Sequence, residues 1–320
     1  EFIVDGNQVV SQEAGAAIEG GCSRGERIKS YSIKTSKKTG TKNYGYKFYD
    51  SWDISNYANL HLRNGGTAYS CLPFRDGLMQ TFAHGMNIDY QGSMPVAYYR
   101  NGKYVHLMTL NERMNADYVK AHYGYDDDEI DLISLGDQKG VEASKGTKEA
   151  YDELVSYLTD NNPNNPGYFE GACERMDMDE YIDYQIFQQF IVNTDWPGNN
   201  TKLWRAKENG RFRWMLYDTD FGFGLCSYDW LSSSSTNMIQ WCQGGSQWAN
   251  NQSWMVAIFK SLSANKEFEK KFTTRYLINL TDLIRSLCHN LVHNSLKQPI
   301  INHNCINNII DICKQNLNKY

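Results

Sequence analysis

The sequence predicts an α+β fold, with a strand-rich first part followed by a mostly helical remainder. Short stretches within about the first 110 residues alternate apolar and polar side chains, a period of two that is typical of strands. From residue 115 onward, apolar residues recur at helical spacing instead. A chain of 320 residues is long enough for one large domain or for two packed lobes. We therefore expect a single domain over 1–320, with a strand-rich part over 1–112 and a helical part over 113–320.

Four alternating stretches predict the strands of the first part. They span Arg27–Lys34, Asn59–Arg63, Val96–Tyr99 and Tyr104–Leu110. The last two flank Asn101-Gly102, a dipeptide suited to a two-residue hairpin turn because both of its positions tolerate positive φ. Between these strands, the apolar spacing of Phe74–Met86 predicts a helix.

The remainder of the chain has helical signals interrupted by one hairpin. Tyr151–Leu158 carries apolar residues at helical spacing, and the polar stretch Asp160–Gly167 ends that helix. Asp179 is placed to cap a second helix with a buried stripe from Ile182 to Ile191. Asn209-Gly210 predicts a second hairpin. After it we expect a long ordered excursion over Cys226–Ser253 and a helical stretch over about the last 60 residues.

Composition excludes several classes of protein. The formal net charge of -5 gives the surface no general attraction for nucleic acid. No run approaches the roughly 20 apolar residues that cross a bilayer, so no membrane span is expected. The eight cysteines form no C-x-x-C pair, which argues against a zinc ribbon or a thioredoxin-type site. Nothing in the sequence determines the oligomeric state.

Polar residues gather at one end of the second predicted hairpin. A tight turn centred between 209 and 210 would pair residues whose numbers sum to about 419. Asn199 or Asn200 then lies opposite Asp218 or Asp220, and Asp195 comes just before the first strand. Carboxylate and amide oxygens suit magnesium, which takes its other ligands from water and phosphate. The hairpin therefore predicts a magnesium site where its strands end.

The order of these residues also matches the phosphoryl-transfer segment of protein kinases. There, a catalytic Asp is followed five positions later by a metal-binding Asn, then by a hairpin and Asp-Phe-Gly. Here Asp195 and Asn200 have that spacing, and Asp220-Phe221-Gly222 spells the triplet. The His-Arg pair before the Asp and a G-x-G-x-x-G loop are absent. Each residue alone fits a turn or a helix cap, but the ordered set favours a functional site.

A family resemblance extends over most of the chain, from about Gly20 to Phe272. As an ordered set, its segments resemble the spore coat protein H (CotH) kinase domain, a diverged branch of the protein kinase-like fold. The segments are Gly21–Arg24, Lys29–Tyr31, Leu62–Gly66, Arg75-Asp76, Asn101–Tyr104, Leu110–Arg113, Asp195–Asn200 and Tyr217–Asp220. The resemblance implies a two-lobed kinase-like fold, with a β-rich N-terminal lobe and a mostly helical C-terminal lobe.

The resemblance also implies a reaction and roles for residues. ATP, with Mg²⁺ or Mn²⁺, would give its γ-phosphoryl group to a Ser or Thr hydroxyl of a protein substrate. Asp195 would be the catalytic-loop carboxylate, and Asn200 with Asp218 would hold the metal. The literal Asp-Phe-Gly match favours Asp220 as the principal ligand instead of Asp218. An extracellular, cell-surface or spore-coat setting is expected rather than the cytoplasm.

The nucleotide-binding residues are expected in the strand-rich part. The resemblance implies that Lys29 grips the phosphates and that Leu110 to Glu112 form a hinge that contacts adenine. From the alternation, Lys29 either points inward to an anion or lies on a solvated strand face. Ser23 and Arg24, after a Gly pair, are candidates to cradle phosphate through backbone amides. The family usually has Trp-Gly where this chain has Val105-His106, which weakens the expectation for the adenine pocket.

Three alternatives remain open. The same fold can serve as a binding module without catalysis, such as a surface adhesin. A kinase can also act on a sugar or another small molecule, for which the Trp-rich stretch after Asp229 leaves room. Finally, His289 and His293 lie one helical turn apart near Cys288, His303 and Cys305, a zinc-like grouping that is more common among surface or core residues.

Overall fold

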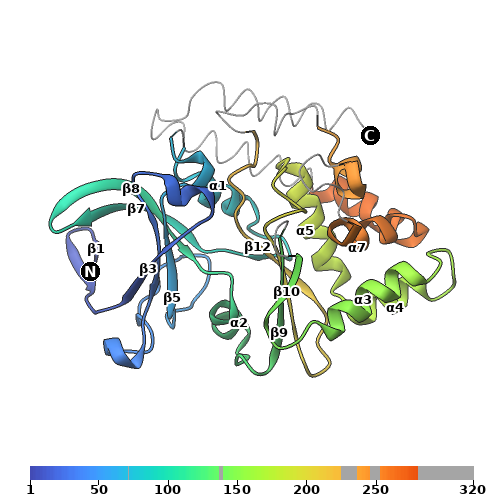
Figure 1. Ribbon diagram of the computed structural model, residues 1–320, viewed down its shortest axis with the longest axis horizontal. Coiled ribbons are helices and arrows are strands. Elements are labelled where there is room, and N and C mark those ends of the chain that lie inside the picture. The colour runs from blue at the N-terminus through green and yellow to red at the C-terminus, as the bar shows by residue number, and fades with distance from the viewer. Residues whose placement is uncertain (71, 137–139, 225–235, 246–252, 280–320) are drawn as a thin grey trace. The chain divides into compact units, whose positions relative to one another are not determined.

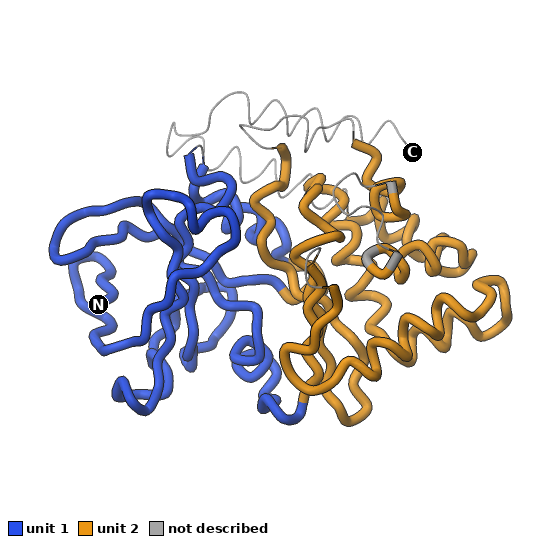
Figure 2. The backbone as a smooth tube through the Cα atoms, viewed as in Figure 1, with its two compact units in different colours: residues 1–84, 90–129 blue, residues 85–89, 130–320 orange. Residues whose placement is uncertain are grey.

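The structure is a computed structural model that describes residues 1–70, 72–136, 140–224, 236–245 and 253–279 (Figure 1). It confirms an α+β fold with three β-sheets. The chain forms two compact units (Figure 2). Unit 1 comprises residues 1–84 and 90–129, and unit 2 comprises residues 85–89 and 130–320.

Unit 1 is built on a five-stranded antiparallel sheet in the order β3-β4-β5-β8-β7. The strands are β3 (Gly15–Glu19), β4 (Ser30–Lys34), β5 (Asn59–Arg63), β7 (Ser93–Arg100) and β8 (Lys103–Glu112). A separate hairpin joins β1 (Phe2–Val4) to β2 (Asn7–Val10). The helical segments are η1 (Cys22–Gly25), η2 (Lys37–Thr39), η3 (Gly66–Ala68), α1 (Arg75–Phe82) and α2 (Ala116–Tyr123).

The predicted elements of unit 1 are present, with differences at β4 and at α1, which ends at Phe82 and not at Met86. The Asn101-Gly102 turn has positive φ at both residues, 52° and 74°, as the hairpin requires. Strand β4 begins at Ser30 and not at Arg27, so Lys29 lies just before the strand. The reason is local: the Lys29 ammonium bonds back to the preceding turn, donating to the carbonyl oxygens of Arg24 and Glu26.

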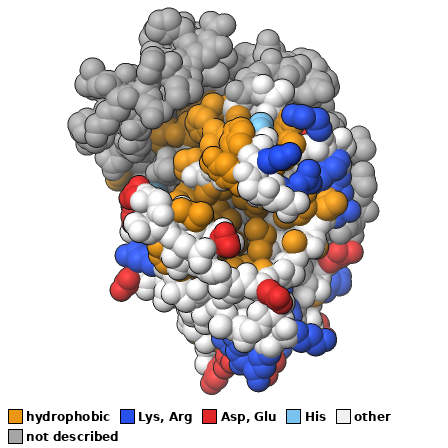
Figure 3. All heavy atoms as spheres, turned by 90° about the vertical axis from the view of Figure 1, so that its left-hand side faces the viewer, with side chains coloured by type: hydrophobic (Ala, Val, Ile, Leu, Met, Phe, Trp, Pro, Cys, Tyr) orange, Lys and Arg blue, Asp and Glu red, His pale blue; other side chains and the backbone are white. Residues whose placement is uncertain are grey.

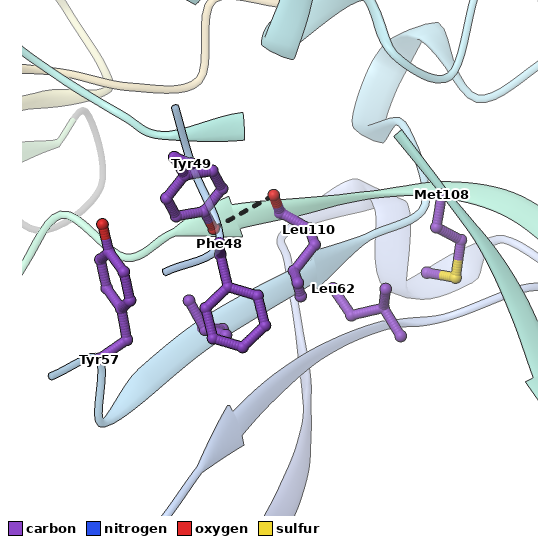
Figure 4. Close-up of a cluster of buried hydrophobic side chains, with 7 residues drawn as sticks. Phe48, Tyr49, Tyr57, Leu62, Met108 and Leu110 are labelled. Atoms are coloured by element: carbon purple, nitrogen blue, oxygen red, sulfur yellow. Dashed lines mark hydrogen bonds between the residues drawn. The ribbon is translucent and has the colours of Figure 1, made fainter. Parts of the chain in front are cut away.

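Aromatic residues form the core of unit 1. The cluster of buried side chains consists of Phe48, Tyr49, Tyr57, Leu60, Leu62, Met108 and Leu110 (Figure 4). Its aromatic members come from 44–57, a stretch without helix or strand, whereas the aliphatic members come from the sheet. Because Tyr49 donates its hydroxyl to the Leu110 carbonyl over 3.3 Å, the stretch is fastened to β8 as well as packed on it. Burial of aromatic surface thus orders a segment that has no helical or strand hydrogen bonds of its own.

One face of unit 1 exposes apolar side chains (Figure 3). Among the large hydrophobic residues most exposed in unit 1 are Ile3, Ile18, Tyr99 and Tyr104. The two tyrosines flank the β7–β8 turn and make an edge-to-face contact with ring centroids 5.7 Å apart. Strand β7 is an edge of the sheet and contains Pro95.

Unit 2 contains a five-stranded sheet in the order β10-β9-β11-β12-β6 and most of the helices. The strands are β6 (Asp89–Tyr90), β9 (Ile130–Gly136), β10 (Gly140–Lys145), β11 (Thr201–Ala206) and β12 (Arg213–Leu216). The helices are α3 (Glu149–Asp160), α4 (Tyr168–Arg175), α5 (Met178–Phe190), α6 (Met238–Gln240), the π-helix η4 (Trp241–Gly245) and α7 (Ser253–Ser263), followed by helix over 266–279.

Helix α5 is buried on all sides, although its polar residues predicted a single buried stripe. Twelve of its thirteen residues are buried, and five of these are Gln, Asp or Glu. Asp183 accepts two hydrogen bonds from Arg275, which satisfies its buried carboxylate. The predicted cap was wrong: Asp177 caps the helix by accepting from the Glu180 amide, while Asp179 pairs with Lys271.

The β11–β12 hairpin has a register that differs from the prediction by two residues. Lys202 lies opposite Met215 and Leu203 opposite Trp214, so paired numbers sum to 417 and not to about 419. Phe212, just before β12, forms an isolated parallel bridge with Met176 outside the hairpin. A shift of two preserves the face on which each side chain lies. The predicted convergence of polar residues at the end of this hairpin therefore survives the change.

Several expectations lie wholly or partly outside the described residues. The Cys226–Ser253 excursion is described only over 236–245 and at Ser253, and the zinc-like grouping at 288–305 is not described. Within the described part of the last 60 residues, the chain is helical up to 279, apart from a short break at 264–265. No helix in the described residues is long and apolar enough to span a membrane.

We predict that Phe48→Ala lowers the free energy of unfolding of the protein by about 3–5 kcal/mol, because it leaves a cavity among the aromatic residues of unit 1. Ile3→Ala is the matched control, since Ile3 is 57% exposed and its truncation should change the free energy by less than about 0.5 kcal/mol. Urea unfolding followed by tryptophan fluorescence measures both. Equal effects of the two substitutions would show that the aromatic cluster does not hold the stretch 44–57.

Candidate active site

The chain turns sharply after α5, and this turn carries the first part of the site. Val192 has φ of 54°, a conformation that a β-branched residue rarely adopts and that costs on the order of 1–3 kcal/mol. Two hydrogen bonds between Asn193 and Gln188 close the turn. The Asn193 amide donates to the Gln188 carbonyl, and the Asn193 side chain donates to Gln188 Oε1 over 2.9 Å. Burial of both side chains fixes a strained backbone just before Asp195.

Asp195 is held by the two asparagines that follow it. Asn200 donates from Nδ2 to Asp195 Oδ2 over 2.7 Å, and Asn199 donates more weakly over 3.4 and 3.5 Å to the two carboxylate oxygens. Asn200 has φ of 55°, which asparagine tolerates better than most residues. Its Nδ2 is used by Asp195, so its Oδ1 remains the acceptor that can face a cation.

Tyr184 on α5 braces the loop from beneath, a role that the sequence did not reveal. Its hydroxyl hydrogen bonds with Gln188, Thr201 and Trp196, which oppose the rise in the pKa of Tyr184 caused by burial. The Trp196 carbonyl accepts from Trp241 Nε1 over 2.7 Å. A cavity of about 30 Å³, near the size of one water molecule, lies among Tyr184, Trp196 and neighbouring side chains. A buried tyrosine six residues before a helix end is too common a pattern to mark this role from sequence.

The second part of the site follows β12. Asp218 has φ of 54° and is half-buried, whereas Asp220 is only 2% exposed. Phe223 donates its amide to the Ile191 carbonyl over 2.6 Å, and its ring meets that of Phe190. The Asp-Phe-Gly segment is thereby tied to the start of the Asp195 loop. This contact explains how two segments more than 20 residues apart reach one place.

Three carboxylates converge where these segments meet. The pKa of Asp195 is raised to about 8, first by burial, then by the negative charges of Asp218 and Asp220. The hydrogen bonds from Asn199 and Asn200 oppose the shift without cancelling it. Such a cluster of like charges is a favourable site for a divalent cation, which would relieve the repulsion.

The donor set fits a hard cation. Carboxylates from Asp218 and Asp220 and the amide oxygen of Asn200 are the ligand types that magnesium takes, with water and phosphate completing its shell. Among the described residues, no group of three or more His, Cys, Asp or Glu side chains is placed to hold a metal ion. A site of two carboxylates and one amide is consistent with that finding, because magnesium seldom uses an all-protein cage.

A family model described as CotH kinase protein matches residues 16–300, which is most of the chain. The chain belongs to the CotH kinase family. Membership indicates kinase-like phosphoryl transfer in general, and the match includes residues of both units. No curated protein is significantly similar to the chain in sequence.

The residues predicted to bind nucleotide in this CotH kinase belong to unit 1. Lys29 donates from Nζ to the carbonyl oxygens of Arg24 and Glu26, each over 2.6 Å, and so closes the turn around η1. Arg24 reaches back to the Ile18 carbonyl, and its amide donates to the Gly21 carbonyl. The predicted cradle is therefore a closed turn in which the Arg24 amide is already used, while Ser23 is half-buried within η1.

The predicted adenine-contacting residues lie at the end of β8. Leu110 is buried in the core of unit 1. Glu112 is 2% exposed, and its carboxylate bonds with His122 Nε2 over 2.7 Å and accepts from the Gly92 amide. Its carbonyl accepts from Gln91 Nε2. The side chain of Glu112 thus braces the end of β8, and the backbone of the stretch is paired with β5 on one side and β7 on the other.

Without divalent metal, the stability of the protein should fall as pH rises from about 4 to about 8. The Asp195 carboxyl ionises near pH 4 when unfolded but stays protonated to about pH 8 when folded, so the folded state binds more protons over that window. Asp195→Asn removes this dependence, and its stability relative to the parent should therefore rise over the same window. Chemical unfolding in EDTA across pH 4–9 measures this, with Asp160→Asn on the exposed end of α3 as control. Parallel profiles for parent and Asp195→Asn would contradict the assignment.

Proposed function

We propose that this protein transfers the γ-phosphoryl group of ATP to a Ser or Thr hydroxyl of a protein, with Mg²⁺ or Mn²⁺ at the carboxylate cluster. The observation that carries the proposal is the convergence of Asp195, Asp218 and Asp220 within unit 2, with Asn200 bonded to Asp195. Three carboxylates alone would repel a polyphosphate, so a nucleotide can sit there only with a cation between them.

The metal, when bound, would bridge the phosphates and offset the charge that develops in transfer. Asn200 would present Oδ1 to it, and Asp218 or Asp220 would supply carboxylate oxygen. Asp220 is the more buried of the two, whereas Asp218 is the more accessible. Separate substitutions at these positions distinguish the principal ligand from the one that supports it.

Asp195 would hold the acceptor hydroxyl and take its proton. Its Oδ2 accepts the short bond from Asn200, whereas Oδ1 has only a 3.5 Å contact with Asn199. Oδ1 is therefore the atom to which the hydroxyl would donate. A pKa near 8 in the absence of metal keeps the carboxyl close to working pH, as a general base requires, and a nearby cation would lower it.

In a two-lobed kinase-like fold, unit 1 would serve as the N-terminal lobe and unit 2 as the C-terminal lobe. Lys29, with two of its N–H groups bonded to carbonyls in the described structure, would offer its third to a phosphate oxygen. Ser23 and Arg24 lie on the turn that Lys29 closes, and would line the same phosphates. Leu110 to Glu112, the predicted hinge, would meet the adenine.

We expect label from γ-labelled ATP to appear in a Ser-rich protein acceptor when Mg²⁺ or Mn²⁺ is present. Asp195→Ala should lower the rate by about 10²–10⁴-fold, the usual contribution of a general base. Asp218→Ala and Asp220→Ala should each weaken the response of the transfer rate to added metal. The substitution at the principal ligand should weaken it more than the other. Asp160→Ala, an exposed residue of unit 2, should transfer label as the parent does.

Other results of this assay point elsewhere. Label that passes to sugars or small alcohols but not to protein would make the protein a small-molecule kinase. Metal-dependent ATP binding without transfer to any acceptor would make it a binding module. Absence of ATP binding would overturn the assignment of the site.

Lys29→Met should raise the Kd for ATP with magnesium about 10-fold, equal to about 1.4 kcal/mol of lost binding free energy. The lost interaction is a charge-assisted hydrogen bond to phosphate. Lys38→Met changes an exposed lysine of the same unit and serves as control. Titration with a fluorescent ATP analogue measures both, and an unchanged Kd for Lys29→Met would restrict Lys29 to closing its turn.

A further inference from the structure

A lysine lies over an aromatic ring beside the carboxylate cluster. Lys202 is the second residue of β11 and places its ammonium 4.5 Å from the centroid of the Tyr217 ring. It follows Asn200 by two positions, and Tyr217 directly precedes Asp218. The pair therefore connects the two segments of the site across the hairpin.

The register of the hairpin explains the contact. Lys202 lies opposite Met215, and Tyr217 is two residues further along, so the two side chains are diagonal neighbours on one face. Thr201 and Leu203 lie on the other face of β11 and line the small cavity beneath the Asp195 loop. Lys202 is therefore directed away from that cavity.

Tyr217 couples this lysine to the acidic residues. Tyr217 holds the ammonium of Lys202 over its ring face, 4.5 Å from the centroid, directly before Asp218 in the chain. A phenol ring face attracts a cation without neutralising it as a carboxylate would. Two arginines of the same hairpin form ion pairs within unit 2: Arg205 pairs with Asp131, and Arg213 pairs with Asp89 and Asp177.

We propose that Lys202 contacts the transferring phosphoryl group and that Tyr217 positions it there. The inference rests on the proposed function, because the metal at the carboxylates draws phosphate oxygens to that end of the hairpin. A lysine ammonium is a compact charge with three donors, suited to the oxygens on which charge accumulates during transfer.

The step conserves atoms and charge. The bond from the γ-phosphorus to the bridging oxygen of ADP breaks, and a bond from the acceptor oxygen to that phosphorus forms. The hydroxyl proton passes to Asp195 Oδ1, and the electron pair of the broken bond leaves on ADP. Lys202 keeps its protons throughout and acts by charge alone.

Paired substitutions test the lysine and the ring separately. Lys202→Met should lower kcat about 10²-fold with the KM for ATP nearly unchanged, since it removes a charge needed in the transition state. Lys202→Arg should restore most of the rate. Tyr217→Leu should resemble Lys202→Met, Tyr217→Phe should resemble the parent, and the double variant Lys202→Met/Tyr217→Leu should be no slower than Lys202→Met. Lys207→Met, on an exposed lysine in the turn of the same hairpin, is the control.

The affinity for Mn²⁺, measured by electron paramagnetic resonance, should change in the opposite direction to the transfer rate. Loss of a positive charge near the carboxylates should tighten Mn²⁺ binding severalfold while transfer falls. A Lys202→Met variant that loses both transfer and Mn²⁺ binding would show a structural role and overturn the inference.

The remaining outcomes separate the two proposals. If the parent transfers phosphate and Lys202→Met does so as fast as Lys207→Met, the inference about Lys202 is wrong and the proposed function stands. If the parent transfers no phosphate in the presence of metal, the proposed function fails, and the inference fails with it.

Discussion

Repulsion among three carboxylates is the constraint around which unit 2 is organised. Asp195, Asp218 and Asp220 are close enough for the latter two to raise the pKa of the first, and burial raises it further. Left to itself, such a cluster would separate or draw in water. The fold prevents separation by fastening both segments to the end of α5, through the Asn193 bonds to Gln188 and through the Phe223 amide bond to Ile191.

The burial of α5 is what makes that fastening possible. A helix exposed on one side could rotate or fray, but this one is enclosed all round and its polar residues are bonded inside unit 2. The unfavourable φ angles of Val192, Asn200 and Asp218 are maintained by that enclosure. The favourable packing of α5 thus offsets the backbone strain and the charge repulsion at the site. Functional sites are commonly strained in this way while the surrounding structure supplies the stability.

The sequence predicted which polar residues gather at the end of the hairpin better than it predicted how they are held there. Asn-Gly turns and the order of Asp and Asn residues are local signals, and they located the hairpin and its polar end. The register was off by two because the pairing of Phe212 with Met176 depends on a tertiary contact that no local pattern encodes. The Asp179 cap failed for the same reason, since Lys271 is a distant partner in sequence. The roles of Tyr184 and of the aromatic stretch 44–57 were not predicted, because they depend on packing and on hydrogen bonds that form only in the folded protein.

Pro95 has a consequence for how this protein behaves at high concentration. Strand β7 is eight residues long and forms an edge of its sheet, and an edge of that length invites another chain to add a strand. Proline has no amide hydrogen, so a ladder offered along that edge is interrupted at the third residue of the strand. The sheet can therefore end in solvent beside exposed tyrosines without becoming a template for growth into fibres.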